Sequence, residues 1–134
     1  MRYTLLQVLA RNIASSLGKM KKGDGFLADD KYIVTWAFGH LFSLCDIEDY
    51  TGPTSTGRWS LENIPCFPEN FKFKLRQGNS EADQGVARQF GVISDLCNRP
   101  DVEKIINAGD ADREGEIIVR LCIRHALKTE KAQK

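Results

Sequence analysis

The sequence has few of the residues that usually bind structural zinc, and it has no apolar stretch long enough for a membrane span. It contains four cysteines and two histidines, and no two cysteines form a CxxC pair. A structural zinc site is therefore not expected, and cysteines this scattered are typical of reduced core residues in a cytosolic protein. The longest apolar stretch, residues 32–45, is interrupted by polar residues and is too short to span a bilayer. Residues 1–9 show no signal peptide, so no membrane partner is expected.

The chain also lacks a large net charge, an internal repeat and any low-complexity run. Its net charge is +1, which gives no general electrostatic case for nucleic acid, so any binding of DNA should be weak and salt-sensitive. Of its 134 residues, 42% are hydrophobic and 28% are charged. This composition indicates a single globular domain over residues 1–134, with a polar tail at about 129–134.

The spacing of apolar residues predicts alternating helices and strands. The order suggests that the second half forms a βα unit of a parallel sheet, and that the first half is an extended insertion. The expected helices are 3–17, ended by Gly18, then one from about 80 with a buried stripe at Val86, Phe90, Ile93 and Leu96/Cys97, and a last one to about 128 with Ile117, Ile118, Leu121 and Cys122. The expected strands lie within 25–27, 31–44, 71–75 and 103–108, and residues 46–60 read as a loop.

A cluster of acidic residues is the most informative local feature. Asp110, Asp112 and Glu114 fall at alternate positions, directly before Gly115. Like charges this close repel, and a cation or a shared proton normally compensates for them. The cluster follows the predicted strand 103–108, and open α/β sheets bind ligands at the carboxyl ends of strands. In an extended chain the carboxylates of Asp110 and Asp112 would lie roughly 6–7 Å apart. That spacing suits a hydrated Mg²⁺ ion.

Three other interpretations of the cluster stay open on sequence alone. A calcium-binding loop fits the first six positions, but Leu121 occupies position twelve, where that loop needs a bidentate Glu. A solvated acidic turn could simply begin the last helix, because acids suit a helix N-terminus. General acid–base chemistry without a metal is the third.

Several motifs together resemble one family. Residues 110–116 (DADREGE) resemble the DxDxEGE signature of Toprim domains, in the form seen in type IA topoisomerases. Residues 22–26 (KGDGF) and 34–41 (VTWAFGHL) resemble a turn and a strand of topoisomerase III. Residues 58–69 (RWSLENIPCFPE) resemble its "RW.L..LP..P" segment. The similarity covers about residues 8–128 in the right order.

The resemblance implies a fold, a function and a set of site residues. The fold would be α/β and Rossmann-like, with a mostly parallel central sheet flanked by helices and a small β-rich insertion. The whole enzyme would be a cytoplasmic, nucleoid-associated bacterial isomerase that cleaves, passes and reseals single DNA strands, with single-stranded DNA and its own remaining domains as partners. Asp110 and Asp112 would hold Mg²⁺, or Mn²⁺ in its place. Glu114 would be the third acid of the metal site and of catalysis, where it would support the other two or take part in a proton relay. The residues expected near DNA are His40, Arg58, Trp59 and Arg113.

The sequence departs from the family pattern in two places. The family begins with a strand ending in EKPS, whose Glu completes the acidic site, whereas residues 4–8 read TLLQV and no acid precedes Asp24. The family's tyrosine nucleophile lies in a later domain, and Tyr3, Tyr32 and Tyr50 do not occur in that context. We therefore expect this chain to be a fragment of a larger topoisomerase that does not relax DNA by itself.

Other roles remain open for the same residues. The domain could belong to a Toprim nuclease or primase, or it could be a binding module that uses the acidic turn only for structure. His40 suits a structural hydrogen bond as well as a place near DNA, and Trp59 could anchor a loop instead of stacking on a base. The charges nearest to Arg113 favour an ion pair with the carboxylates over a phosphate contact.

Overall fold

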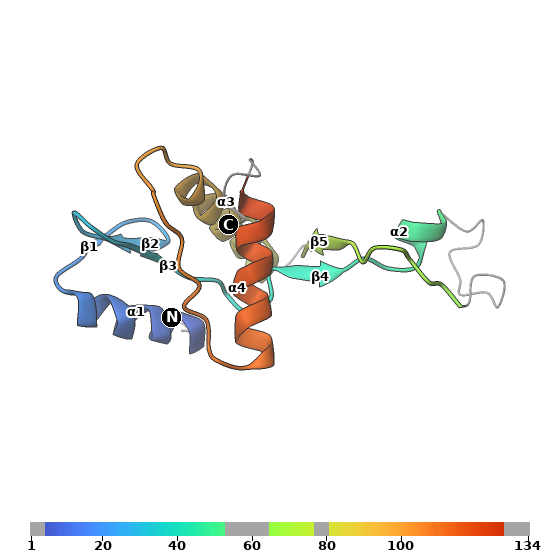
Figure 1. Ribbon diagram of the computed structural model, residues 1–134, viewed down its shortest axis with the longest axis horizontal. Coiled ribbons are helices and arrows are strands. Elements are labelled where there is room, and N and C mark those ends of the chain that lie inside the picture. The colour runs from blue at the N-terminus through green and yellow to red at the C-terminus, as the bar shows by residue number, and fades with distance from the viewer. Residues whose placement is uncertain (1–4, 53–64, 77–80, 128–134) are drawn as a thin grey trace.

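The computed structural model describes residues 5–52, 65–76 and 81–127, which form a mixed α/β structure. Figure 1 shows a body of helices and a small sheet, from which a narrow two-stranded arm extends. The helices are α1 (Leu5–Leu17), α2 (Glu48–Thr51), α3 (Glu81–Cys97) and α4 (Arg113–Ala126). The strands are β1 (Lys21–Lys22), β2 (Phe26–Ala28), β3 (Ile33–Thr35), β4 (Phe42–Leu44) and β5 (Phe73–Leu75). None of the described helices combines the length and apolarity needed to cross a membrane.

The described strands form two small antiparallel sheets. In the first, β2 lies between β1 and β3, with Leu27 opposite Val34. In the second, β4 pairs with β5, with Ser43 opposite Lys74. Strands β2 to β5 follow the β-branched and aromatic runs from which the sequence predicts strands, whereas β1 consists of two lysines outside these runs.

Helix α1 forms as the sequence predicts, but its buried face is narrower than expected. Ala10 and Ala14 are buried, and α1 contacts β3. Leu17, which belongs to the predicted stripe, is 42% exposed because it lies in the last turn of the helix. Gly18 follows in a conformation with φ of 138°, and its N–H bonds to the carbonyl of Ala14 at 3.2 Å. The predicted stop at this glycine is confirmed.

The main core lies where α3 and α4 pack against each other and against β4. Phe42 is its aromatic centre: its ring stacks on His125 with centroids 4.2 Å apart and meets Phe90 edge-on at 5.0 Å. Asn98, just after α3, donates from Nδ2 to the carbonyl of Ala126 at 2.7 Å, which ties the ends of the two helices together. The buried members of this core are Ala37, Leu41, Phe42, Val86, Ile93, Ile118, Leu121, Cys122 and Ala126.

A single buried amide joins α3 to the first sheet. Gln89 is 4% exposed, and its Nε2 donates to the carbonyls of Gly25 at 3.0 Å and Trp36 at 2.7 Å. The hydroxyl of Thr35 lies 3.2 Å from the same nitrogen. Gly25 has a φ of 79°, and a Cβ there would lie 2.6 Å from Gln89 Oε1, so the close approach requires glycine.

The arm, which consists of β4, β5 and α2, carries charge pairs at its surface. Lys74 in β5 bonds to the carboxylates of Asp46 at 2.9 Å and Asp49 at 3.0 Å. These hydrogen bonds raise the pKa of Lys74 and lower the pKa of Asp49. Both partners lie in the predicted loop 46–60, where the structure also forms the short helix α2 that the sequence did not indicate.

The predicted strand at 103–108 is wrong for this structure, and the described residues contain no parallel sheet. Residues 102–110 form neither helix nor strand, and Figure 1 shows them running from the end of α3 to the start of α4. Ile106, which belongs to the predicted strand, is 68% exposed. The physical reason is that a strand needs a hydrogen-bonded neighbour, and no described strand pairs with this segment.

Candidate functional site

The acidic turn, which we define as residues 109–116, forms the start of α4. Asp112 is the N-cap: it has extended backbone angles, and its Oδ1 accepts the N–H of Gly115 at 2.5 Å. Glu114 and Glu116 lie in the first helical turn, where negative charge is favoured by the helix dipole. The interpretation of these acids as a helix start is therefore confirmed. The alternative of a calcium-binding loop also lacks an entering helix, because residues 102–110 are not helical.

Two glycines allow the acidic turn to fold tightly. A Cβ on Gly115 would lie 2.6 Å from the carbonyl oxygen of Asp110 and 2.7 Å from its nitrogen. A Cβ on Gly109 would lie 2.4 Å from the carbonyl oxygen of Gly115. Both contacts are too short for any side chain, and both involve backbone atoms that cannot move aside easily. The two glycines thus bring the backbone of Asp110 against the first turn of α4.

His40 comes from a distant part of the chain to the same place. It follows Gly39, whose φ of 86° turns the chain between β3 and β4. Its Nε2 lies 3.9 Å from the Glu114 carboxylate, and both side chains are well exposed. The structure therefore brings His40 next to the acidic turn.

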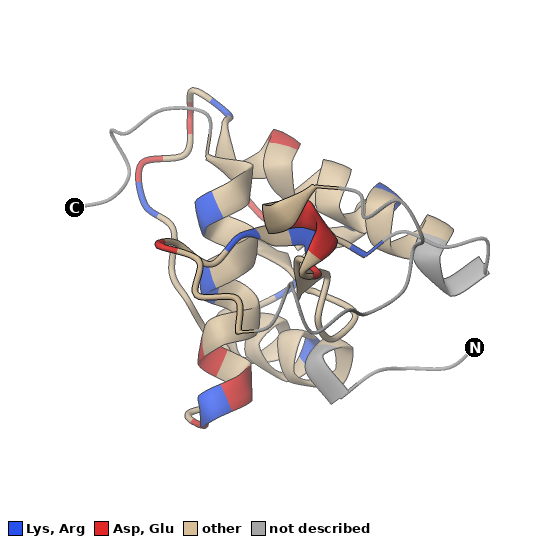
Figure 2. Ribbon diagram, turned by 90° about the vertical axis from the view of Figure 1, so that its right-hand side faces the viewer, with Lys and Arg blue, Asp and Glu red and all other residues tan. Residues whose placement is uncertain are grey.

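Two arginines of α4, Arg113 and Arg120, differ in their partners. Arg120 bonds to Glu116 one turn earlier, and this hydrogen bond raises the pKa of Arg120. Arg113 is exposed, and no salt bridge joins it to a carboxylate within the described part of the chain. The expected ion pair of Arg113 is thus not formed here, because Glu114 lies beside His40 and Glu116 beside Arg120. Figure 2 shows acidic and basic residues together at the lower end of the molecule, where α4 begins.

The side chains of the acidic turn can be compared with those that bind a metal ion in proteins. Among residues 5–52, 65–76 and 81–127, no three His, Cys, Asp or Glu side chains lie close enough to enclose an ion. One carboxylate oxygen of Asp112 is already engaged as the helix cap. Mg²⁺, however, is usually held by one or two carboxylates together with waters and substrate phosphates. The oxygen donors of Asp110 and Asp112 fit that kind of open site, and they do not form a closed cage.

Arg58 and Trp59, the remaining predicted site residues, lie outside the described residues. The four cysteines are free: Cys122 is buried, and Cys45, Cys66 and Cys97 are partly buried. The structure adds Arg76 and Phe73, which line a cavity beside His40 and were not singled out from the sequence. The alternation of phenylalanine and lysine over residues 71–75 predicted the strand but gave no sign of a cavity.

The chain is similar in sequence to several known proteins. Over 115 residues the chain is 41% identical to the DNA topoisomerase 3 of Bacillus thuringiensis (strain Al Hakam), a match that covers 86% of this chain and 14% of that protein. This chain is a homologue of DNA topoisomerase 3. It is 38% identical to the DNA topoisomerase 3 of Bacillus subtilis (strain 168) over 118 residues, covering 88% of this chain and 15% of that protein. The DNA topoisomerase 3 of Bacillus licheniformis is also 38% identical, over 90% of this chain and 15% of its own length.

The resemblance to topoisomerase III is therefore confirmed at the level of homology. No family model matches the chain. The chain spans 14–15% of the length of the topoisomerase 3 relatives that it matches, so these matches concern one part of a much longer protein.

Proposed function

We propose that this chain is the N-terminal Toprim domain of a type IA DNA topoisomerase, and that its acidic turn handles the phosphate of a single DNA strand with Mg²⁺. The observation that carries the proposal is the meeting of His40 with Glu114 at a glycine-tightened turn that bears two further carboxylates. Homology to DNA topoisomerase 3 over 86–90% of the chain supports the same assignment.

The chemistry needs positioning and charge more than it needs reactive protein groups. Phosphoryl transfer depends mostly on holding the reacting oxygens in line and on neutralising developing charge. Asp110 and Asp112 would hold Mg²⁺, which supplies positive charge at the phosphate oxygens when it is bound. Glu114, 3.9 Å from His40, would support these two carboxylates or take part in a proton relay at the leaving 3′-oxygen. Arg113 is exposed and free of salt bridges within the described residues, so it can contact a phosphate.

The chain alone should not relax DNA, because the described tyrosines are not placed as nucleophiles. Tyr50 lies in α2 on the arm, and its hydroxyl oxygen accepts the N–H of Lys72 at 2.7 Å. Tyr32 lies in the turn before β3. Incubation of the pure chain with supercoiled plasmid and Mg²⁺ should leave the plasmid unchanged, and clear Mg²⁺-dependent relaxation would overturn this part of the proposal.

Titration calorimetry with Mg²⁺ tests the metal site. The native chain should show weak binding, and the double variant Asp110→Asn/Asp112→Asn should show none. Asparagine caps a helix about as well as aspartate, so the start of α4 should survive the change. Asp30→Asn removes one exposed carboxylate in the turn between β2 and β3 and should bind like the native chain. Equal heats from the native chain and the double variant would refute the site.

A further inference from the structure

Residues 103–111 lead into the first turn of α4 without belonging to any helix or strand. Among the described residues, the hydrogen bonds that hold this segment come from one side chain, that of Asn107. Its Oδ1 accepts the N–H of Gly109 at 3.0 Å, and its Nδ2 donates to the carbonyl of Glu116 at 3.4 Å. No other hydrogen bond or salt bridge joins this segment to the described part of the chain.

The bond from Asn107 to Gly109 closes a turn just before the first acid of the site. An asparagine side chain that accepts an N–H two residues later forms an Asx turn, which fixes the direction of the chain. A Cβ on Gly109 would lie 2.4 Å from the carbonyl oxygen of Gly115 and 3.1 Å from Cγ2 of Val119, so this turn packs directly on α4. The next residue is Asp110, and its carboxylate therefore leaves the backbone at a point that the turn sets.

The bond from Asn107 to Glu116 connects this turn to the part of α4 that Asp112 caps. Asp112 accepts the N–H of Gly115, the neighbour of Glu116. Both carboxylates are thus placed relative to one helical turn: Asp112 by its own cap, and Asp110 through Asn107. Because a metal site depends on the spacing of its carboxylates, a residue that sets this spacing acts on the ion without touching it.

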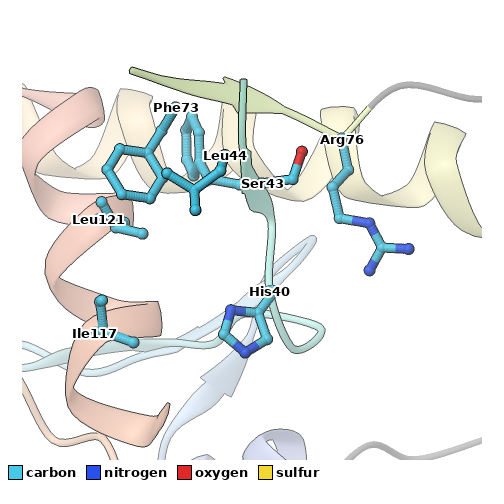
Figure 3. A pocket seen from close by; sticks show the side chains of 8 residues that line it. His40, Ser43, Leu44, Phe73, Arg76, Ile117 and Leu121 are labelled. Carbon is cyan, nitrogen blue, oxygen red and sulfur yellow. The ribbon is translucent and has the colours of Figure 1, made fainter. Parts of the chain in front are cut away.

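His40 does not serve in place of Asn107. It approaches from the side of β4, where it lines a cavity together with Ile117 (Figure 3), and its contact is with Glu114. That contact reaches a residue inside the helix rather than the chain that leads to it. Asn107 itself is exposed, so its two hydrogen bonds contribute little to the stability of the whole fold.

We propose that Asn107 is a positioning residue that sets the spacing of the Asp110 and Asp112 carboxylates for a divalent ion, and the proposal rests on the function proposed above. Asparagine suits this position because its amide accepts one hydrogen bond and donates the other. Serine could accept the N–H of Gly109 but has no second polar atom for Glu116, and alanine could make neither bond.

Titration of the full chain with Mn²⁺ tests the proposal, because the electron paramagnetic resonance signal of free Mn²⁺ measures even weak binding. The native chain should bind Mn²⁺ through Asp110 and Asp112. Asn107→Ala should bind it about tenfold more weakly, which is typical when a group that orients a metal ligand is removed. Asn107→Ser should lie between the two, because it keeps the bond to Gly109. Asn70→Ala removes an exposed asparagine just before β5 and should bind like the native chain.

Two further measurements separate positioning from a general loss of structure. Amide hydrogen exchange should be faster at Gly109 in Asn107→Ala, because the acceptor of that N–H is gone. Exchange at Gly115 should be unchanged, because its acceptor is Asp112. The urea midpoint of Asn107→Ala should equal that of the native chain.

Three results would overturn the proposal. Equal Mn²⁺ affinity of Asn107→Ala and the native chain would show that the two bonds do not set the site. Weaker affinity accompanied by a lower urea midpoint and faster exchange at Gly115 would make Asn107 a residue that only supports α4. Equal Mn²⁺ binding by the native chain and Asp110→Asn/Asp112→Asn would refute the acidic site, and the role of Asn107 with it. The first two results leave the acidic site standing, so the two failures are distinguishable.

Discussion

Replacing Gln89 with leucine should destabilise the protein measurably, because this amide connects α3 to the first sheet. The side chain is 4% exposed, and its two amide hydrogens serve the carbonyls of Gly25 and Trp36 at 3.0 and 2.7 Å. Leucine has a similar size but provides no donor. The carbonyl of Gly25 keeps a partner in Gln89→Leu, because the Thr35 hydroxyl donates to it at 2.9 Å. The carbonyl of Trp36 loses the donor that Gln89 supplies.

The expected magnitude follows from these two losses. The bond to Gly25 contributes about 1 kcal/mol, because its acceptor stays satisfied. Leaving the part-buried Trp36 carbonyl unpaired costs about 1–3 kcal/mol. Burial of the leucine side chain offsets about 1 kcal/mol of this loss. We therefore expect the free energy of unfolding of Gln89→Leu to fall by about 2 kcal/mol.

Urea denaturation followed by circular dichroism measures this change. Gln84 lies on the same helix and is exposed, so Gln84→Leu is the matched control and should change the free energy of unfolding by less than about 0.5 kcal/mol. If Gln89→Leu and Gln84→Leu have the same stability, the amide does not hold the sheet to α3, and the reasoning fails.

Two further predictions concern the acidic turn and the thiols. Gly115→Ala should lower the free energy of unfolding by about 1–3 kcal/mol because of the close backbone contact with Asp110, whereas Gly91→Ala on the open face of α3 should raise it by about 0.5–1 kcal/mol; urea denaturation compares them, and equal shifts would contradict the packing described. Burial raises the pKa of the Cys122 thiol to about 12, so at pH 8 this thiol stays protonated and should resist iodoacetamide, while the partly buried Cys45 and Cys66 react first. Peptide mass spectrometry gives the order of labelling, and early modification of Cys122 would show that its site opens.

The helices could be predicted from the sequence because their signals are local. The repeat of Val86, Ile93 and Leu96 at helical spacing marks the buried face of α3, and all three are buried. Gly18 ends α1 for a conformational reason that is visible in one residue. The acidic turn was predicted as the start of a helix, and Asp112 does cap α4.

The features that escaped prediction depend on residues far apart in the sequence. The strand expected at 103–108 has the right composition, but a strand also needs a partner, and composition does not reveal whether one is present. Gln89 looks like any polar helix residue until α3 packs on the sheet. The cavity beside His40 requires β5 and α4 to come together, and no local pattern predicts which exposed apolar residues will share a cavity.

The central claim is that the acidic turn holds a divalent ion where it can meet a DNA phosphate, and anomalous diffraction tests it most directly. Crystals of the chain grown with Mn²⁺ and a short single-stranded oligonucleotide would show the ion as an anomalous peak. Our account predicts a peak about 2.1 Å from carboxylate oxygens of Asp110 or Asp112, with a phosphate oxygen completing its coordination. A peak elsewhere on the protein, or none near residues 109–116 at saturating Mn²⁺, would contradict it.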